Sequence, residues 1–113
     1  MGIKRGKVYW VDLPLNKVSH VQGGGRPCVV VSSDTIHKHS GVITVCPLST
    51  KLDDFPFHPK VFVCGKPGQI LCDQIITIDK AQLGDYKDTL TLPEISAMET
   101  ALDLVLGMLD VTL

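Results

Sequence analysis

The stretch that decides the fold is P-C-V-V-V-S-S-D-T-I-H-K-H-S-G-V-I-T-V-C-P-L, residues 27–48. It contains two apolar runs of strand length, residues 27–33 and 42–48, which flank a polar segment at residues 34–41. Runs of this length that are rich in β-branched residues predict strands. We therefore expect two central strands of one sheet.

Further strands are expected on both sides of this pair. Residues 7–13 (K-V-Y-W-V-D-L) alternate, which predicts Val8 and Trp10 on one face and Tyr9, Val11 and Leu13 on the other. Residues 60–64 (K-V-F-V-C) predict a strand, and the following G-K-P-G at 65–68 predicts a hairpin turn. Two prolines exclude regular structure from residues 51–59.

Residues 69–78 (Q-I-L-C-D-Q-I-I-T-I) are expected to form one long strand, interrupted by the polar pair Asp73 and Gln74. Burial of an isolated charge costs several kcal/mol. The Asp73 carboxylate is therefore expected either to face outward or to be held by a partner such as an Arg.

One amphipathic helix is expected at the C-terminus. T-L-P-E at 91–94 has the spacing of a capping box, and apolar residues recur at helical spacing at Ile95, Met98, Leu102, Val105 and Leu109. Ala97, Ala101, Leu104 and Met108 widen the apolar stripe. Packing against a second subunit and a simple core helix explain this width equally well.

These elements predict a mainly β protein with a C-terminal α-helix, folded as a small barrel or a strongly curved sheet. No linker divides the 113 residues, so residues 1–113 are expected to form a single domain. The hydrophobic fraction of 44% is that of a folded protein. No apolar run is long enough for a signal sequence or a membrane span, so a soluble cytoplasmic protein is expected.

Charge is distributed unevenly along the chain. Residues 1–51 hold seven Lys and Arg against two Asp, a net charge of +5, whereas residues 52–113 hold four Lys against ten Asp and Glu, a net charge of −6. This asymmetry favours a basic face that meets phosphate and a separate acidic region.

Metal and cofactor chemistry is not expected. The four cysteines lie inside apolar runs without a C-x-x-C pair, which indicates buried small side chains in a reducing compartment. His37 and His39 form an H-x-H that could face a metal from a strand edge, but no third ligand lies nearby in the sequence.

Cleavage of RNA without a metal needs a base for the ribose 2′-OH, a cation for the phosphorane oxygens and an acid for the leaving 5′ oxygen. Arg26 follows three glycines in a loop at residues 14–25 that is expected to be mobile. A guanidinium suits phosphate, while His20 and Asp73 suit proton transfer. Sequence spacing alone does not place these three residues together.

Four motifs resemble, in order and separation, those of the MazF/PemK toxins. They are K-R-G-K-V-Y-W-V-D-L at 4–13, G-G-R-P-C-V-V-V-S-S-D at 24–34, V-C-P-L-S-T-K at 45–51 and I-L-C-D-Q-I-I-T-I-D-K at 70–80. The resemblance covers nearly the whole chain, including the terminal helix.

The resemblance implies an SH3-like β-barrel of the CcdB/MazF/PemK type and a homodimer. It also implies sequence-specific, metal-independent cleavage of single-stranded RNA, usually leaving a 2′,3′-cyclic phosphate. A further implied partner is an antitoxin whose C-terminal segment occupies the RNA groove, and DNA is expected as a partner only through the toxin–antitoxin complex.

Carried onto this chain, the family's catalytic Arg is Arg26, and its catalytic hydroxyl falls on Ser49. Because this chain reads Ser49-Thr50 where many relatives read Thr-Ser, both hydroxyls are candidates. PemK-type members also imply catalytic roles for His20 and Asp73. Leu71 stands where such members carry an Arg, which removes a possible acid.

Further residues are candidates for RNA binding. Gln22 and Gln74 can hydrogen-bond base edges, and Phe55, Phe57 and His58 can either stack on bases or anchor their loop to the core. The RNA-binding candidates are Gln22, Gly24, Gly25, Lys51, Phe57 and Gln74.

Two other functions are compatible with these residues. One is a toxin on the same barrel that binds DNA gyrase without catalysis, as CcdB does, and has no need of Arg26. The other is a regulatory module that binds nucleic acid through the basic first half, with strong salt dependence and no cleavage.

Overall fold

The computed structural model describes residues 2–13 and 24–109 of the chain. Its strands are β1 Lys7–Leu13, β2 Gly24–Val30, β3 Val42–Ser49, β4 Lys60–Val63, β5 Lys66–Ile70, β6 Ile76–Asp79 and β7 Leu83–Thr89. Its helices are α1 Asp34–His39, the 3-10 turn η1 Lys80–Gln82 and α2 Leu92–Val105. In these two described segments no helix has the length and apolar character needed to cross a membrane.

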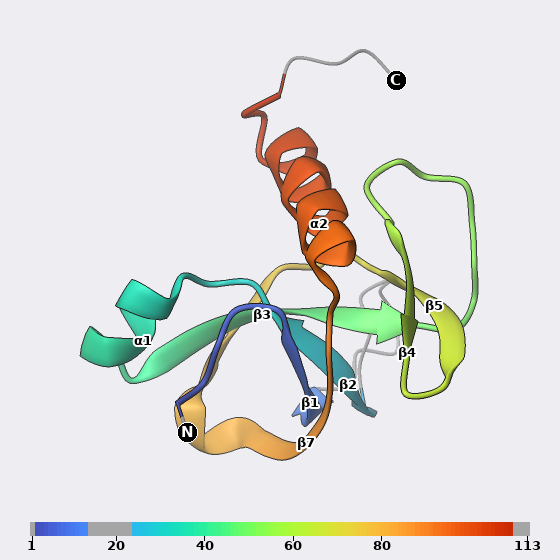
Figure 1. Ribbon diagram of the computed structural model, residues 1–113. Coiled ribbons are helices and arrows are strands. Elements are labelled where there is room, and N and C mark those ends of the chain that lie inside the picture. The colour runs from blue at the N-terminus through green and yellow to red at the C-terminus, as the bar shows by residue number, and fades with distance from the viewer. Residues whose placement is uncertain (1, 14–23, 110–113) are drawn as a thin grey trace.

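The strands form one antiparallel sheet in the order β4-β5-β3-β2-β1-β7. β3 is long enough to pair with two strands on the edge opposite β2, with β6 along Val42–Val45 and with β5 at Leu48 and Ser49. Figure 1 shows α1 beside the start of β3 and β5 beside its end. The last residues of β3 therefore lie between two neighbouring strands, β2 on one edge and β5 on the other.

Alternation along the central strands divides the core between the two faces of the sheet. Val29 and Cys46 belong to the cluster that packs under α2, whereas Val30 and Val45 belong to a second cluster on the other face. Burial on both faces explains why residues 27–33 and 42–48 read as continuous apolar runs. The predicted alternation of β1 is confirmed, since Val8 lies in the first cluster and Val11 and Leu13 in the second.

The expected terminal helix forms with the expected start. The Thr91 hydroxyl accepts from the Glu94 amide, the Glu94 carboxylate accepts from the Thr91 amide, and Pro93 lies in the first turn. The end differs, because Gly107 takes a φ of 72° and Met108 donates to the Asp103 carbonyl at 2.7 Å. α2 thus stops at Val105, and Leu109 lies beyond it.

The prediction of one long strand over residues 69–78 is wrong. β5 ends at Ile70, β6 begins at Ile76, and the Gln74 amide donates to the Leu71 carbonyl at 3.0 Å to close a turn between them. The register shows the reason: Ile70 pairs with Leu48 and Ile76 with Val45, so six steps of this segment span three steps of β3, and the three extra residues leave the sheet edge as a turn. Asp73 therefore lies on a turn.

Two loops that were expected to be irregular contain regular structure. Residues 34–39 form α1, capped by the Ser33 hydroxyl, so His37 and His39 lie on a helix and not at a strand edge. Gly24 and Gly25, expected in a mobile loop, begin β2 and pair with Leu13 and Asp12. The rest of that loop, residues 14–23, lies outside the described residues.

Candidate functional site

Arg26 and Ser49 meet because β2 and β3 run antiparallel. Cys28 pairs with Pro47 and Val29 with Cys46, and the same register carried two residues further sets Arg26 opposite Ser49. The Arg26 guanidinium donates to the Leu48 carbonyl at 3.3 Å, which holds the half-buried side chain at the end of β3. The positions that carry the cation and the hydroxyl implied by the resemblance therefore lie opposite each other on adjacent strands.

The two candidate hydroxyls differ in their surroundings. The Ser49 Oγ accepts from the Lys51 amide at 3.1 Å, and Ser49 also pairs with Gln69 of β5. A hydroxyl that accepts one bond still has its own proton to donate. Thr50 is exposed and, with Ser49, borders a second, mainly apolar cleft of about 190 Å³ beside Trp10.

A cleft of about 290 Å³ opens next to Ser49. Its walls come from the end of β3, the loop before β4, β5 and the turn before β6. The lining residues are Ser49, Lys51, Leu52, Asp53, His58, Gln69, Leu71 and Gln74. Three of the predicted site residues, Ser49, Lys51 and Gln74, thus share one cleft.

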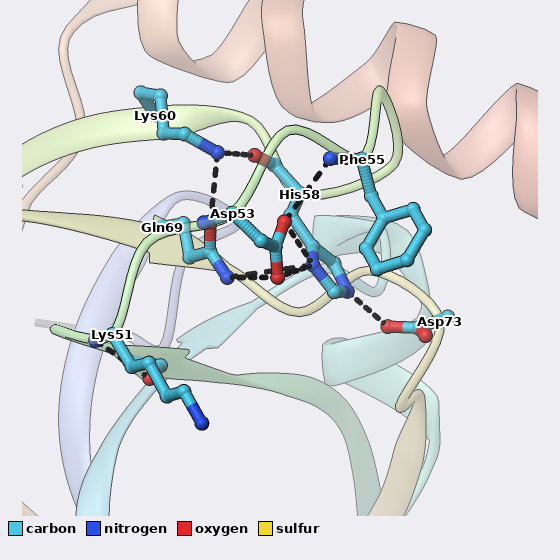
Figure 2. Close-up of polar contacts among 8 residues, drawn as sticks. Lys51, Asp53, Phe55, His58, Lys60, Gln69 and Asp73 are labelled. Carbon is cyan, nitrogen blue, oxygen red and sulfur yellow. Dashed lines mark hydrogen bonds and ion pairs between the residues drawn. The ribbon is translucent and has the colours of Figure 1, made fainter.

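His58 lies in the wall of this cleft between two carboxylates. Its side chain is buried, at 7% exposure, and Figure 2 shows the ring between Asp53 and Asp73. Nδ1 lies 2.9 and 3.0 Å from the two Asp53 oxygens, and Nε2 lies 2.7 Å from Oδ1 of Asp73. A ring with both nitrogens protonated can donate to both carboxylates at once.

Asp73 reaches His58 from the turn between β5 and β6. Its side chain remains 40% exposed, with Oδ1 toward the ring and the second oxygen turned away from it (Figure 2). The sequence left open whether this carboxylate faces outward or is held by a partner such as an Arg, and the structure shows His58 as a partner. Leu71, two residues earlier, is buried in the cleft wall, so the position carries packing and no charge.

Asp53 is held on its outer side by two further donors. Gln69 Nε2 donates to Oδ2 at 2.9 Å and the Phe55 amide donates to Oδ1 at 3.1 Å. Partial burial opposes ionisation of this carboxyl, but the hydrogen bonds from Gln69, His58 and the Phe55 amide lower its pKa to about 2. Asp53 is therefore a carboxylate throughout the neutral range.

The other predicted RNA-binding residues are placed variously. Phe57 is half-buried, stacks on Phe55 with ring centroids 4.9 Å apart and meets the edge of His58 at 4.8 Å. A Cβ on Gly25 would come within 2.6 Å of the Trp10 ring, so the close packing of Trp10 already requires a glycine there. His20 and Gln22 lie outside the described residues.

Sequence reasoning missed the roles of three residues. His58 was considered only as a stacking surface, and neither Asp53 nor Gln69 was considered. Gln69 offered a signal, because it is the polar start of an apolar run and is 1% exposed. The pairing of Asp53 with His58 had no comparable signal, since it depends on a loop without regular structure.

The cysteines are mostly the buried small side chains that were expected. Cys28, Cys46 and Cys72 are buried, and burial raises the pKa of the Cys28 thiol to about 12, against an opposing effect of Arg26. Cys64 is the exception, because it is exposed in the β4–β5 turn. Among the residues that the structure describes, no group of three His, Cys, Asp or Glu side chains could hold a metal ion.

Comparison with known proteins supports one family. Residues 4–106 match the family of PemK-like, MazF-like toxins of type II toxin-antitoxin systems. Endoribonuclease MazF of Staphylococcus epidermidis is 32% identical over 112 residues, covering 94% of this chain and 92% of that protein. Endoribonuclease MazF of Staphylococcus saprophyticus is 30% identical with the same coverage.

Solved structures support the same fold. A mycobacterial endoribonuclease, solved in complex with its cognate antitoxin, superposes with a TM-score of 0.82 at 27% identity, covering 95% of this chain and 97% of that one. MazF of Deinococcus radiodurans superposes with a TM-score of 0.78 at 22% identity, covering 96% and 99% of the two chains. The predicted fold, mainly β with a C-terminal helix and of the MazF/PemK type, is thereby confirmed, and this chain belongs to the PemK-like, MazF-like toxins of type II toxin-antitoxin systems.

Proposed function

We propose that this toxin is a cytoplasmic, metal-independent endoribonuclease that cuts single-stranded RNA at the cleft beside Ser49. Endoribonuclease activity is what the names of its curated relatives state. The observation that carries the residue assignment is the register that sets Arg26 opposite Ser49 on adjacent strands, together with the cleft that Ser49 shares with His58, the partner of Asp73.

Arg26 and Ser49 are proposed to bind the scissile phosphate. The guanidinium donates to nonbridging oxygens as negative charge builds up on the phosphorane, and the Ser49 hydroxyl donates a further hydrogen bond. Donors fixed before the reaction stabilise that charge without reorganisation. Thr50 is the alternative hydroxyl, but its exposure gives it a less fixed position.

The His58–Asp73 pair is proposed to supply the leaving-group proton. The 2′ oxygen attacks phosphorus to form the cyclic phosphate, the bond from phosphorus to the 5′ oxygen breaks, and the 5′ oxygen takes a proton from Asp73. This is the proton that His58 Nε2 shares with Asp73 Oδ1: it passes from the ring to the carboxylate and on to the 5′ oxygen, which leaves the ring neutral and protonated at Nδ1. His20, which the resemblance implies, is proposed to take the 2′-OH proton.

Recognition of RNA is assigned to the rim of the same cleft. Lys51 is exposed and suits phosphate, while Gln74 can hydrogen-bond a base edge. Phe55 is more exposed than Phe57, so a base that stacks here meets Phe55 first. Gly24, Gly25 and Gln22 remain candidates from the sequence.

The experiment uses purified protein and a labelled single-stranded RNA in EDTA. The wild type is expected to cut the RNA, and Arg26→Ala to lose about 100-fold or more in kcat while it remains folded. Lys38→Ala, which removes one exposed cation on α1, is the matched control and is expected to keep full activity. Intact RNA with the wild type rejects nuclease activity and favours a toxin that binds its target without cleavage.

The proposal includes two protein partners. The mycobacterial relative was solved with its cognate antitoxin, which supports an antitoxin for this chain. Its binding over the RNA cleft is proposed from what the resemblance implies. A homodimer is proposed because apolar side chains after α2 stay exposed, Leu106 at 62% and Met108 at 76%. DNA is proposed as a binding partner only of the toxin–antitoxin complex.

A further inference from the structure

Asp53 contacts the His58 ring on the side away from Asp73 (Figure 2). We propose that Asp53 is a positioning residue of the nuclease: it fixes the His58 ring with a proton on Nδ1, so that Nε2 is the nitrogen that exchanges a proton with Asp73. This inference rests on the proposed function, because it assigns a task within that reaction. Asp53 then positions the ring, while His58 and Asp73 pass the proton.

The orientation of Gln69 is decided by its neighbours. Its Oε1 accepts from Lys60 Nζ at 2.8 Å and from the Asp53 amide at 3.1 Å. An ammonium has only donors, so the amide oxygen must face Lys60 and the amide nitrogen must face Asp53. Because Gln69 is 1% exposed, water does not compete for these bonds.

This fixed amide in turn fixes the carboxylate. Oδ2 of Asp53 faces the Gln69 Nε2 donor and Oδ1 faces the Phe55 amide, so both oxygens are anchored before they meet the ring. Lys60 also donates to the His58 carbonyl at 2.9 Å, which holds the backbone that carries the ring. Figure 2 shows that these contacts enclose the Asp53 side of the imidazole.

The protonation pattern of the ring follows from these contacts. Nδ1 faces two carboxylate oxygens, so it must carry a proton to avoid a repulsive contact. Nε2 faces Oδ1 of Asp73, and one proton between these two atoms satisfies both. The charged groups that face His58 are Asp53 from its own loop, Asp73 from the turn before β6 and Lys60 from β4.

Asp53→Asn tests the inference against the matched control Asp54→Asn. An Asn at position 53 would turn its amide nitrogen toward a donor, either Gln69 Nε2 or the Phe55 amide, in both orientations. We expect kcat to fall about 100-fold with KM for RNA unchanged, and the pH dependence of kcat to change shape. Asp54 is an exposed neighbour, so its variant removes the same charge and is expected to keep the wild-type profile.

A purely structural role for Asp53 predicts a different result. Asp53→Asn would then lower the melting temperature, but kcat per folded molecule and its pH profile would match the wild type, and the inference would be overturned. In the double variant, Asp53→Asn combined with His58→Gln, no further loss beyond that of His58→Gln is expected. Additive losses would also contradict a role that acts through His58.

The ring can also be examined in the wild type, which covers the case of an unfolded variant. With 15N-labelled histidine, NMR at neutral pH is expected to find His58 Nδ1 protonated. A neutral ring protonated at Nε2 overturns the inference. If Arg26→Ala abolishes cleavage while Asp53→Asn matches the wild type, the inference fails alone; if the wild type leaves RNA intact, the proposed function fails.

Discussion

Ser49 and Thr50 are adjacent in sequence, but they occupy different surroundings at the end of β3. Ser49 is half-buried between the Arg26 and Gln69 positions and lines the cleft with His58, whereas Thr50 is exposed beside the second cleft. The end of β3 decides this difference, because Ser49 is the last residue of the strand and pairs with Gln69, whereas Thr50 lies beyond it. The sequence motif alone, which contains both hydroxyls side by side, cannot show which of them faces the cleft.

This difference gives a prediction about catalysis. Ser49→Ala is expected to lower kcat about 100-fold, because a hydrogen bond to the phosphorane is lost, whereas Thr50→Ala is expected to keep nearly full activity. Initial rates on a labelled RNA, corrected for the folded fraction, measure both. Loss in Thr50→Ala with activity retained in Ser49→Ala would transfer the role to Thr50.

Asp53 predicts how stability responds to acid. Its pKa falls from 3.8 to about 2 on folding, so the carboxylate stabilises the folded state fully above pH 3.8. That contribution is lost as the pH falls through about 2, where both states are protonated. Unfolding by urea between pH 5 and pH 2 is expected to show a smaller acid loss in Asp53→Asn than in the wild type.

The same titration has an internal control. Asp54→Asn removes a neighbouring exposed carboxylate and is expected to follow the wild-type curve. If the free energy of unfolding of Asp53→Asn fell with pH as steeply as that of the wild type, Asp53 would not make its stabilising contacts in solution.

At the scale of elements, the β4–β5 hairpin contains an uncommon turn residue. Cys64 and Gly65 take φ values of 53° and 78°, the positive pair that a type I′ turn requires. Glycine adopts such angles without strain, but a cysteine does not. The turn between the predicted strands formed one residue earlier than G-K-P-G suggested, because Lys66 and Pro67 already pair with Val63 and Phe62.

Cys64→Asn is therefore expected to stabilise the protein. Asn-Gly is a favoured pair in this turn, and the variant keeps the Cys64 backbone amide that donates to Asp88 at 2.8 Å. The free energy of unfolding is expected to rise by about 1 kcal/mol, measured by urea denaturation. Cys64→Ala, which retains the strain, serves as the control, and an equal gain in both would contradict the turn explanation.

Local signals in the sequence were sufficient for some elements and insufficient for others. The central strands and the start of α2 could be predicted because apolar runs and a capping box are local patterns. The break after Ile70 could not, since the three extra residues that leave the edge of β3 between Ile70 and Ile76 show only in the strand pairing. The same limit applies to the site: Arg26 and Ser49 came from motifs, but the Asp53–His58–Asp73 contacts join segments that only the fold brings together.

At the scale of the whole molecule, the two charge halves of the sequence intermix. Arg5 pairs with Glu99 at 2.6 Å, and the cleft beside Ser49 contains Lys51 together with Asp53. The expected separation into a basic and an acidic region therefore does not describe this site. The charges that an RNA phosphate meets at the cleft therefore depend on these local neighbours more than on the net charge of −1.

The proposed homodimer gives a prediction at this scale. Sedimentation at micromolar concentration is expected to find about twice the 12.3 kDa of one chain. Leu106→Asp, after the end of α2, is expected to shift the protein toward monomer, whereas Leu92→Asp at the other end, 81% exposed, is the matched control. A wild type that sediments as a monomer would contradict the dimer without affecting the cleavage chemistry.

The proposed cleavage begins when an RNA 2′-OH attacks the phosphorus held by Arg26. Two labelled oligonucleotides in EDTA test this attack, one all-ribose and one with a single 2′-deoxy nucleotide before the cut. The first is expected to be cut to a product ending in a 2′,3′-cyclic phosphate, and the second to be bound with similar affinity but left whole. Equal cleavage of both would contradict it.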